Sequence, residues 1–155
     1  MAKEFDSVRS MIETLKPSYP VYCLRPDIIG QAAGRFLDQF PGRVLYAVKC
    51  NPHPEVLRAL HKAGIRHFDT ASLPEIAQVR ETFRDAACYF MHPVKGRAVI
   101  NTAAKVYEID TYIIDHPSEL NKILQELGGA EGLTIYVRLK TPPVDGAFYH
   151  LASKF

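Results

Sequence analysis

The sequence predicts an α/β protein in which repeated strand and helix units surround a parallel sheet. Five short apolar runs, rich in β-branched and aromatic residues, alternate with segments of helical periodicity. The runs begin at residues 44, 65, 87, 112 and 133, so about 21 to 25 residues separate successive starts, which leaves room for a crossover helix each time. With 155 residues, 47% of them hydrophobic, the chain has enough apolar material for one core.

The expected strands cover residues 44–48, 65–68, 87–91, 112–114 and 133–139. Two helices between them show one broad apolar face each, which we expect to pack on the sheet; the faces consist of Ile28, Ile29, Ala32, Ala33, Phe36, Leu37 and Phe40, and of Leu120, Ile123, Leu124 and Leu127. Gly64, Gly128 and Gly129 follow helical segments and are expected to adopt left-handed cap conformations. Ahead of these units, an apolar stripe predicts a helix over residues 8–15, and residues 20–24 read as a short strand.

Composition and charge narrow the range of functions. The chain has 19 basic and 17 acidic residues, interspersed along its length, so there is no electrostatic case for nucleic acid or an anionic membrane as a partner. No apolar run is long enough to span a bilayer and the N-terminus has no signal-peptide pattern, so we expect a cytoplasmic protein. Cys23 and Cys88 are expected in the core, and neither the cysteines nor the histidines have metal-ligand spacing, so no metal site is assigned.

Lys49 is the most informative residue of the chain. It ends the buried-strand pattern of Tyr46-Ala47-Val48-Lys49 and precedes a turn at Asn51-Pro52. The last side chain of such a strand lies at the carboxyl end of the sheet, where ligands of α/β folds bind. Burial there would lower the pKa of the amine and make it a nucleophile that forms an imine with pyridoxal phosphate or a carbonyl substrate. The alternative is a lysine that extends past the strand into water.

Several segments together resemble one family. Tyr46-Ala47-Val48-Lys49-Cys50-Asn51-Pro52 resembles the cofactor-lysine motif of the pyridoxal-phosphate decarboxylases of the ornithine, lysine, diaminopimelate and arginine group, closest to the ornithine type. Further matches follow in the same order: Phe68-Asp69-Thr70-Ala71-Ser72 with Glu75, where the family usually has Cys in place of Thr70, then Asp115-His116, Val137-Arg138-Leu139 and Leu151-Ala152-Ser153-Lys154-Phe155. The family fold is a (β/α)₈ barrel of the alanine-racemase type.

The resemblance implies an incomplete barrel. Such a barrel takes roughly 250 residues, and five strands cannot close one. We therefore expect residues 1–24 to form a helix and strand preceding the barrel, and residues 25–155 to form the N-terminal part of a barrel that binds pyridoxal 5'-phosphate. The groups that hold the phosphate and the pyridine nitrogen in the family would lie beyond Phe155, so we expect little or no activity from these 155 residues alone.

The resemblance also implies roles for five residues. Lys49 corresponds to the lysine that bonds to the cofactor, and Asp69 to an aspartate that holds and orients the amine once substrate has displaced it; a helix-leading aspartate is the alternative for Asp69. Glu75 matches a site glutamate, although Ser72-x-x-Glu75 also reads as a capping box. Arg138, on a buried strand, is expected on the cofactor side or in a structural ion pair. His92 either donates into the pocket or begins a turn.

The implied reaction is decarboxylation of a basic amino acid, foremost ornithine to putrescine in polyamine biosynthesis, by a homodimer in the full-length protein. Lysine, diaminopimelate and racemase chemistry on the same barrel are further alternatives. A different class of function also remains open at this point, because a partial barrel or truncated homologue could bind a full-length relative and regulate it without catalysis.

Overall fold

The structure, a computed structural model, describes residues 3–140. It contains a five-stranded parallel sheet whose order in space is the order in the chain. The strands are β1 (Leu45–Ala47), β2 (His67–Thr70), β3 (Ala87–Phe90), β4 (Thr111–Ile114) and β5 (Thr134–Val137). The predicted α/β architecture with a parallel sheet is therefore confirmed. Within the described range β1 and β5 are the two edges, so the sheet is open.

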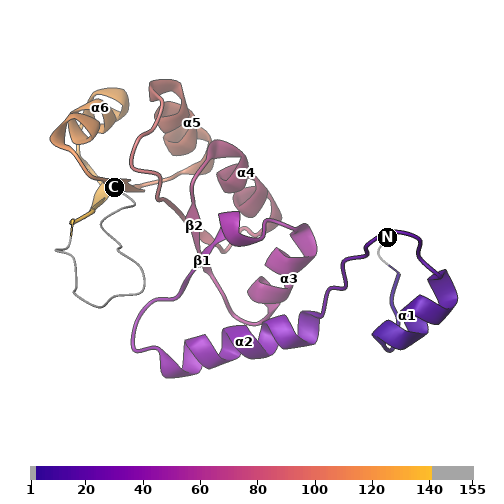
Figure 1. Ribbon diagram of the computed structural model, residues 1–155. Helices are drawn as coiled ribbons and strands as arrows, with labels where there is room; N and C mark the ends of the chain where they lie inside the picture. Colours follow the sequence, from indigo (N-terminus) through magenta and orange to yellow (C-terminus); the bar gives the residue numbers. More distant parts are fainter. Residues whose placement is uncertain (1–2, 141–155) are drawn as a thin grey trace.

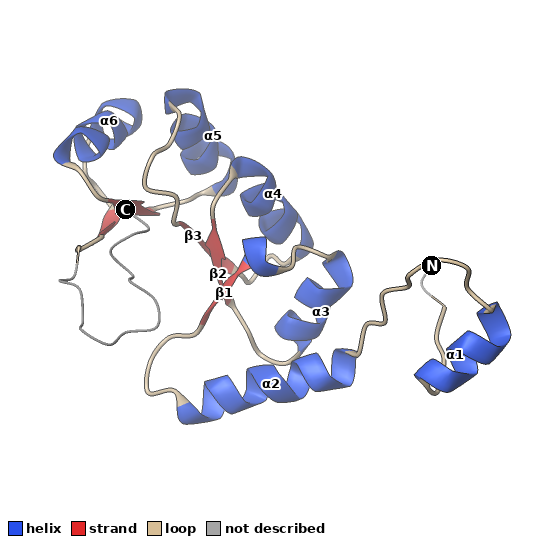
Figure 2. Ribbon diagram, in the orientation of Figure 1, coloured by secondary structure: helices blue, strands red, loops and turns tan. Residues whose placement is uncertain are grey.

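The described residues form six α-helices, and the last four connect successive strands and gather on one face of the sheet. They are α1 (Val8–Leu15), α2 (Pro26–Gln39), α3 (Pro54–Lys62), α4 (Leu73–Thr82), α5 (Arg97–Tyr107) and α6 (Pro117–Leu127), and a single 3₁₀ turn, η1 (Val48–Cys50), follows β1. Figure 2 shows α3 to α6 side by side along the sheet, as right-handed crossovers between parallel strands require. In Figure 1, α1 is set apart from the rest and joined to α2 by an extended segment.

The two faces of the sheet differ in chemistry. Side chains alternate between the faces of a strand, and the helix-covered face carries the fully buried side chains of Phe68, Thr70 and Tyr112, each 0% exposed. The opposite face, here called the inner face because it would line a barrel, carries these residues by alternation and register: Leu45, Ala47, His67, Asp69, Ala87, Tyr89, Thr111, Ile113, Thr134 and Tyr136. The two ionisable side chains of β2, His67 and Asp69, thus lie on the face that lacks helices.

Three expectations about the N-terminal part are wrong. Residues 20–24 form no strand, because no neighbouring strand offers them hydrogen bonds, and Tyr22 is fully exposed. Cys23, in the same segment, is exposed instead of buried, whereas Cys88 is buried as expected. The apolar face of α2 lies against α3 and not on the sheet, and of its members only Ala33 is buried while Phe36 stays 64% exposed. The helix predicted over residues 8–15 is confirmed.

Several strands differ in their bounds from the prediction. One of them differs because a helix end takes up the backbone amide of a residue predicted to lie in the strand. Ile65 was expected to start the second strand, but its amide donates to the Leu60 carbonyl and closes the end of α3, so β2 begins at His67. The fifth strand is shorter than the predicted 133–139. The expected caps are confirmed, since Gly64, Gly128 and Gly129 all have positive φ. At Gly128 the left-handed conformation lets its amide bond to the Leu124 carbonyl and end α6.

Candidate active site

Lys49 lies in the turn that follows β1. The strand ends at Ala47 and Lys49 is the middle residue of η1, so it does not occupy the strand end that the sequence predicted. Its side chain is exposed among the described residues, and the expected burial of the amine is therefore wrong. The reason is geometric, because the inner face is open on this side of the sheet.

The turn that carries Lys49 is fixed by hydrogen bonds on both sides of it. The Tyr46 hydroxyl donates to the Asn51 carbonyl at 3.3 Å, and the Asn51 side-chain oxygen accepts from the His53 amide at 3.1 Å. The Gln78 side chain, from α4, donates to the Pro52 carbonyl at 2.6 Å. Lys49 therefore extends from a backbone segment held by its own strand and by α4.

Asp69 lies on the inner face of β2, paired in register with Ala47 of β1 and Tyr89 of β3. Burial raises the pKa of its carboxyl above the ordinary value; the Lys49 ammonium lowers it in part, and the Glu75 carboxylate raises it further. The register also pairs Asp69 with Ala47, two residues before Lys49, and Glu75 lies in the first turn of the helix that follows Asp69. The structure thus brings together the lysine and the two acids that the sequence singled out.

Glu75 does not form the capping box that the sequence suggested, in which its side chain would accept from the Ser72 amide. Its carboxylate accepts a hydrogen bond from the Ala71 amide at 2.9 Å, and so satisfies a backbone donor ahead of α4. Ser72 is the N-cap residue of α4, but its side chain makes no cap hydrogen bond, so the reciprocal bond expected from the sequence is absent. One carboxylate therefore fixes the loop between Asp69 and α4 and also adds negative charge near Asp69.

Arg138 and His92 lie at other parts of the same edge of the sheet. Arg138 follows β5, its amide bonds to the Ile114 carbonyl, and it lines a cavity of about 380 Å³ with Asp115, His116 and two neighbours. The sheet order places β5 and β1 at opposite edges, so the structure does not bring Arg138 to Lys49. His92 is exposed and its Nδ1 lies 2.7 Å and 3.2 Å from the carbonyl oxygen and amide of Val94, which is a local turn.

A buried ion pair near this edge was not predicted from the sequence. The Lys95 side chain is 0% exposed, and its Nζ lies 3.1 Å from a Glu119 carboxylate oxygen and donates to the Ile113 and His92 carbonyls at 2.7 Å and 3.0 Å. The second Glu119 oxygen pairs with Lys122 at 2.6 Å. This group joins the loop after β3 to the start of α6, and it holds the carboxyl ends of β3 and β4 in place.

The pKa shifts of this pair follow from its composition. Burial lowers the pKa of Lys95, and hydrogen bonding to Glu119 offsets this only in part. For Glu119 burial acts to raise the pKa, but hydrogen bonds from Lys122 and Lys95 outweigh it and the net shift is downward. The two shifts differ in origin, because burial dominates at Lys95 whereas the Glu119 carboxylate accepts hydrogen bonds from two ammonium groups.

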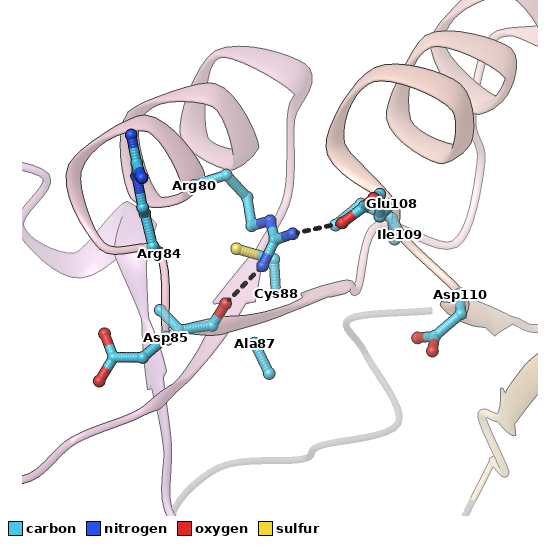
Figure 3. Close-up of a pocket in the computed structure, with 9 residues that line it drawn as sticks. Arg80, Arg84, Asp85, Ala87, Cys88, Glu108, Ile109 and Asp110 are labelled. Atoms are coloured by element: carbon cyan, nitrogen blue, oxygen red, sulfur yellow. Dashed lines mark hydrogen bonds and ion pairs between the residues drawn. The ribbon is translucent and has the colours of Figure 1, made fainter.

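A second cavity, of about 310 Å³, lies at the opposite, amino end of β3 and β4 (Figure 3). Arg80 extends across it, donating to the Ala86 carbonyl at 3.0 Å and pairing with Glu108 at 3.1 Å. Burial raises the pKa of the Cys88 thiol to about 12, so the thiol is not a nucleophile at neutral pH. In barrel folds this end serves stability and the carboxyl end serves function. The candidate site is therefore the end that carries Lys49.

Metal-binding clusters and membrane-spanning helices are both absent from residues 3–140. Residues 3–140 contain no cluster of three or more His, Cys, Asp or Glu side chains that could hold a metal ion. Over the same residues, no helix has the length and apolar character needed to cross a bilayer.

Fold and site together define a class. A parallel sheet with helices on one face, a lysine after its first strand and an aspartate on its second is the N-terminal part of a barrel with an amine at its carboxyl end. The family model described as "Pyridoxal-dependent decarboxylase, pyridoxal binding domain" matches residues 27–149. The chain therefore belongs to the pyridoxal-dependent decarboxylases, and the resemblance seen in the sequence is confirmed.

Relatives agree with this assignment. A lysine/ornithine decarboxylase of Selenomonas ruminantium is 36% identical over 104 residues, which are 66% of this chain and 26% of that enzyme. Among solved structures, Paramecium bursaria Chlorella virus arginine decarboxylase bound to agmatine matches with a TM-score of 0.78 at 25% identity, over 96% of this chain and 39% of that one. Lysine/ornithine decarboxylase of Vibrio vulnificus complexed with putrescine matches with a TM-score of 0.71 at 28% identity, over 86% and 37%. The chain thus spans well under half the length of these relatives.

Proposed function

We propose that this chain supplies the lysine-bearing part of a pyridoxal-phosphate-dependent decarboxylase that acts on a basic amino acid. The observation that carries the proposal is the placement of Lys49 near Asp69 at the carboxyl end of adjacent strands, inside the region that matches the family's pyridoxal binding domain. The primary amine of Lys49 is the group that an aldehyde cofactor requires, and its exposure leaves it accessible to one.

The residues of the site divide the work. Lys49 would hold pyridoxal phosphate through its amine, and the cofactor, when bound, would supply an acceptor for the electron pair left by loss of carbon dioxide. Asp69 holds the released ammonium of Lys49 by charge and returns it to the same place. Glu75 keeps the loop after Asp69 in position through the Ala71 amide. Arg138, at the end of β5, is proposed to contact the cofactor as the family resemblance implies. His92, in the loop after β3 where the family more often has Asn, is proposed to contact it from its position alone.

Ornithine is the proposed substrate and putrescine the product, which places the protein in polyamine biosynthesis. The relatives that support this choice act on lysine, ornithine or arginine according to their names, and one of them is complexed with putrescine. The full-length protein is proposed to be a cytoplasmic homodimer. Lysine is the second candidate substrate, because the relative with 36% identity is a lysine/ornithine decarboxylase.

Reductive trapping tests the attachment site. The protein is incubated with pyridoxal phosphate, reduced with borohydride and digested, and the labelled peptide is located by mass spectrometry. We expect the label on Lys49, and we expect Lys49→Arg, which keeps the charge but not a nucleophilic amine, to lose it. Lys122→Arg, which changes a lysine with a 19% exposed side chain away from the site, is the matched control. Label that persists at the same level in Lys49→Arg contradicts the proposal.

A second candidate is a regulatory partner without catalysis. The observation that favours it is the open sheet, whose edge strands β1 and β5 offer backbone hydrogen bonds to another chain. Co-purification with a full-length relative, measured by size-exclusion chromatography and light scattering, tests it. The two candidates separate on one point, because only the decarboxylase requires the Lys49 amine.

A further inference from the structure

A chain of hydrogen bonds crosses three strands on the inner face. Arg43, two residues before β1, donates from a guanidinium nitrogen to the Tyr89 hydroxyl of β3 at 3.0 Å, and that hydroxyl lies 3.0 Å from Nδ1 of His67 on β2. The Tyr89 and His67 rings also meet edge to face, with centroids 5.8 Å apart. Tyr89 is only 5% exposed, although it lies on the face without helices.

The protons of this chain can be placed from its donors. A guanidinium only donates, so the Tyr89 oxygen accepts from Arg43, and its own proton is left to bond Nδ1 of His67. His67 is then neutral, with its remaining proton on Nε2. Burial and, after it, the positive charge of Arg43 lower the pKa of His67, which agrees with a neutral ring.

These hydrogen bonds lie next to the candidate site on the inner face of the sheet. Lys49 follows the strand that Arg43 precedes, and Asp69 is two residues after His67 on the same face of β2. Tyr89 is the register partner of Asp69 on the neighbouring strand. Barrel interiors are ordinarily filled by branched apolar side chains, whereas Arg43, Tyr89 and His67 are polar and join the segment before β1 to β3 and β2.

We propose that Tyr89 is a positioning residue for the Lys49–Asp69 pair, because its hydroxyl joins the segment entering β1 to His67 of β2 and so fixes the relative position of the two strands that carry the pair. The inference rests on the proposed function of Lys49. A positioning role can be distinguished from a purely structural role of Tyr89. Only the positioning role requires the electrostatic environment of Asp69 to change when the Tyr89 hydroxyl alone is removed.

The test compares two tyrosine hydroxyls in the full chain. Tyr89→Phe removes the central hydroxyl and keeps the ring. Tyr112→Phe is the matched control, because Tyr112 is 0% exposed on the helix-covered face of β4 and its hydroxyl donates to the Ile109 carbonyl at 3.0 Å. The titrations of His67 and Asp69 are followed by nitrogen-15 and carbon-13 NMR, and pyridoxal phosphate affinity is measured by absorbance.

In Tyr89→Phe we expect the titration midpoint of His67 to rise, because the neutral ring loses a donated hydrogen bond. The midpoint of Asp69 should also rise, because a looser β1 weakens the lowering effect of Lys49. Pyridoxal phosphate should bind roughly five- to tenfold more weakly, the effect of one lost hydrogen bond. Tyr112→Phe should leave all three unchanged. Should Tyr89→Phe fail to fold, Arg43→Gln removes the guanidinium that donates to the Tyr89 hydroxyl. This variant should raise the titration midpoint of His67 in the same way.

The experiment distinguishes failure of the positioning role of Tyr89 from failure of the proposed function. If Tyr89→Phe leaves the His67 and Asp69 midpoints where Tyr112→Phe leaves them, the positioning role is overturned whatever the cofactor does. If the unmodified protein takes up no pyridoxal phosphate, the proposed function fails, and the two titrations still decide whether Tyr89 positions the pair.

Discussion

Replacing Lys95 with Met tests whether the buried ion pair holds the carboxyl end of the sheet together. Methionine keeps most of the length of the side chain and removes the ammonium. The Ile113 and His92 carbonyls then lose a donor at 2.7 Å and 3.0 Å, and Glu119 loses one of its two cations. Removing one partner of a buried pair costs about 3 to 5 kcal/mol. Because Glu119 keeps Lys122 at 2.6 Å, we expect the lower end, about 3 kcal/mol.

Urea unfolding followed by circular dichroism measures this loss. With a slope of about 2 kcal/mol per molar urea, a loss of about 3 kcal/mol lowers the unfolding midpoint by about 1.5 M. Lys122→Met is the control, because the Lys122 side chain is 19% exposed and leaves the Lys95–Glu119 contact in place; we expect it to cost under about 1 kcal/mol. Equal midpoints for the two variants would refute the reasoning.

The same pair predicts the direction of a pH effect. The pKa of Glu119 is lowered in the folded protein, so its contribution to stability is complete above the ordinary glutamate pKa, about 4.3, and is lost as pH falls through the folded-state value. The difference in unfolding free energy between the unmodified protein and Lys95→Met should therefore narrow in acid. A difference that stays constant from pH 7 to pH 3 would show that Glu119 is not the partner that matters.

Two other predictions concern side chains away from the site. With three cysteines in the chain, a thiol reagent at pH 8 should react quickly with the exposed Cys23 and Cys50 and slowly with Cys88, whose pKa is about 12; a fast third thiol before denaturant is added would contradict this. The hydrogen bond from His61 lowers the pKa of Asp85, so Asp85→Asn should reduce stability above about pH 4 and lose its effect as pH falls through the folded-state pKa of Asp85. Urea unfolding midpoints of the unmodified protein and of Asp85→Asn, measured at pH 7 and at pH 3, check that the loss of stability is present at pH 7 and smaller at pH 3.

The sequence was sufficient for the architecture because the pattern of apolar runs is local. Five runs separated by helical segments predict a parallel sheet without knowledge of any contact. Boundaries depend on which backbone groups a helix end uses, and this is why Ile65 belongs to the end of α3 and not to β2. The strand predicted at residues 20–24 failed for a related reason, since an extended segment becomes a strand only when a neighbour pairs with it.

The site was predictable in part. Lys49, Asp69 and Glu75 were found from motifs, and the structure brings them together because adjacent parallel strands end at the same edge. The support beneath them was missed, since the bonds from Arg43 through Tyr89 to His67 depend on strand register, which no local pattern reveals. One signal was available, because His67 lies two residues before Asp69 and so must share its face.

The exposure of Lys49 identifies what the described residues do not supply. A nucleophilic lysine at neutral pH needs a lowered pKa, which comes from burial or from neighbouring positive charge. The Lys49 side chain is exposed in the described part of the chain, and its charged neighbour Asp69 is an acid. A second layer of side chains over the inner face would remove water from Lys49 and Asp69 together, and burial of the two groups would favour the uncharged carboxyl and the uncharged amine. The hydrogen bonds through Tyr89 are proposed to position this pair, so covering the inner face should affect Lys49 differently in the unmodified protein and in Tyr89→Phe.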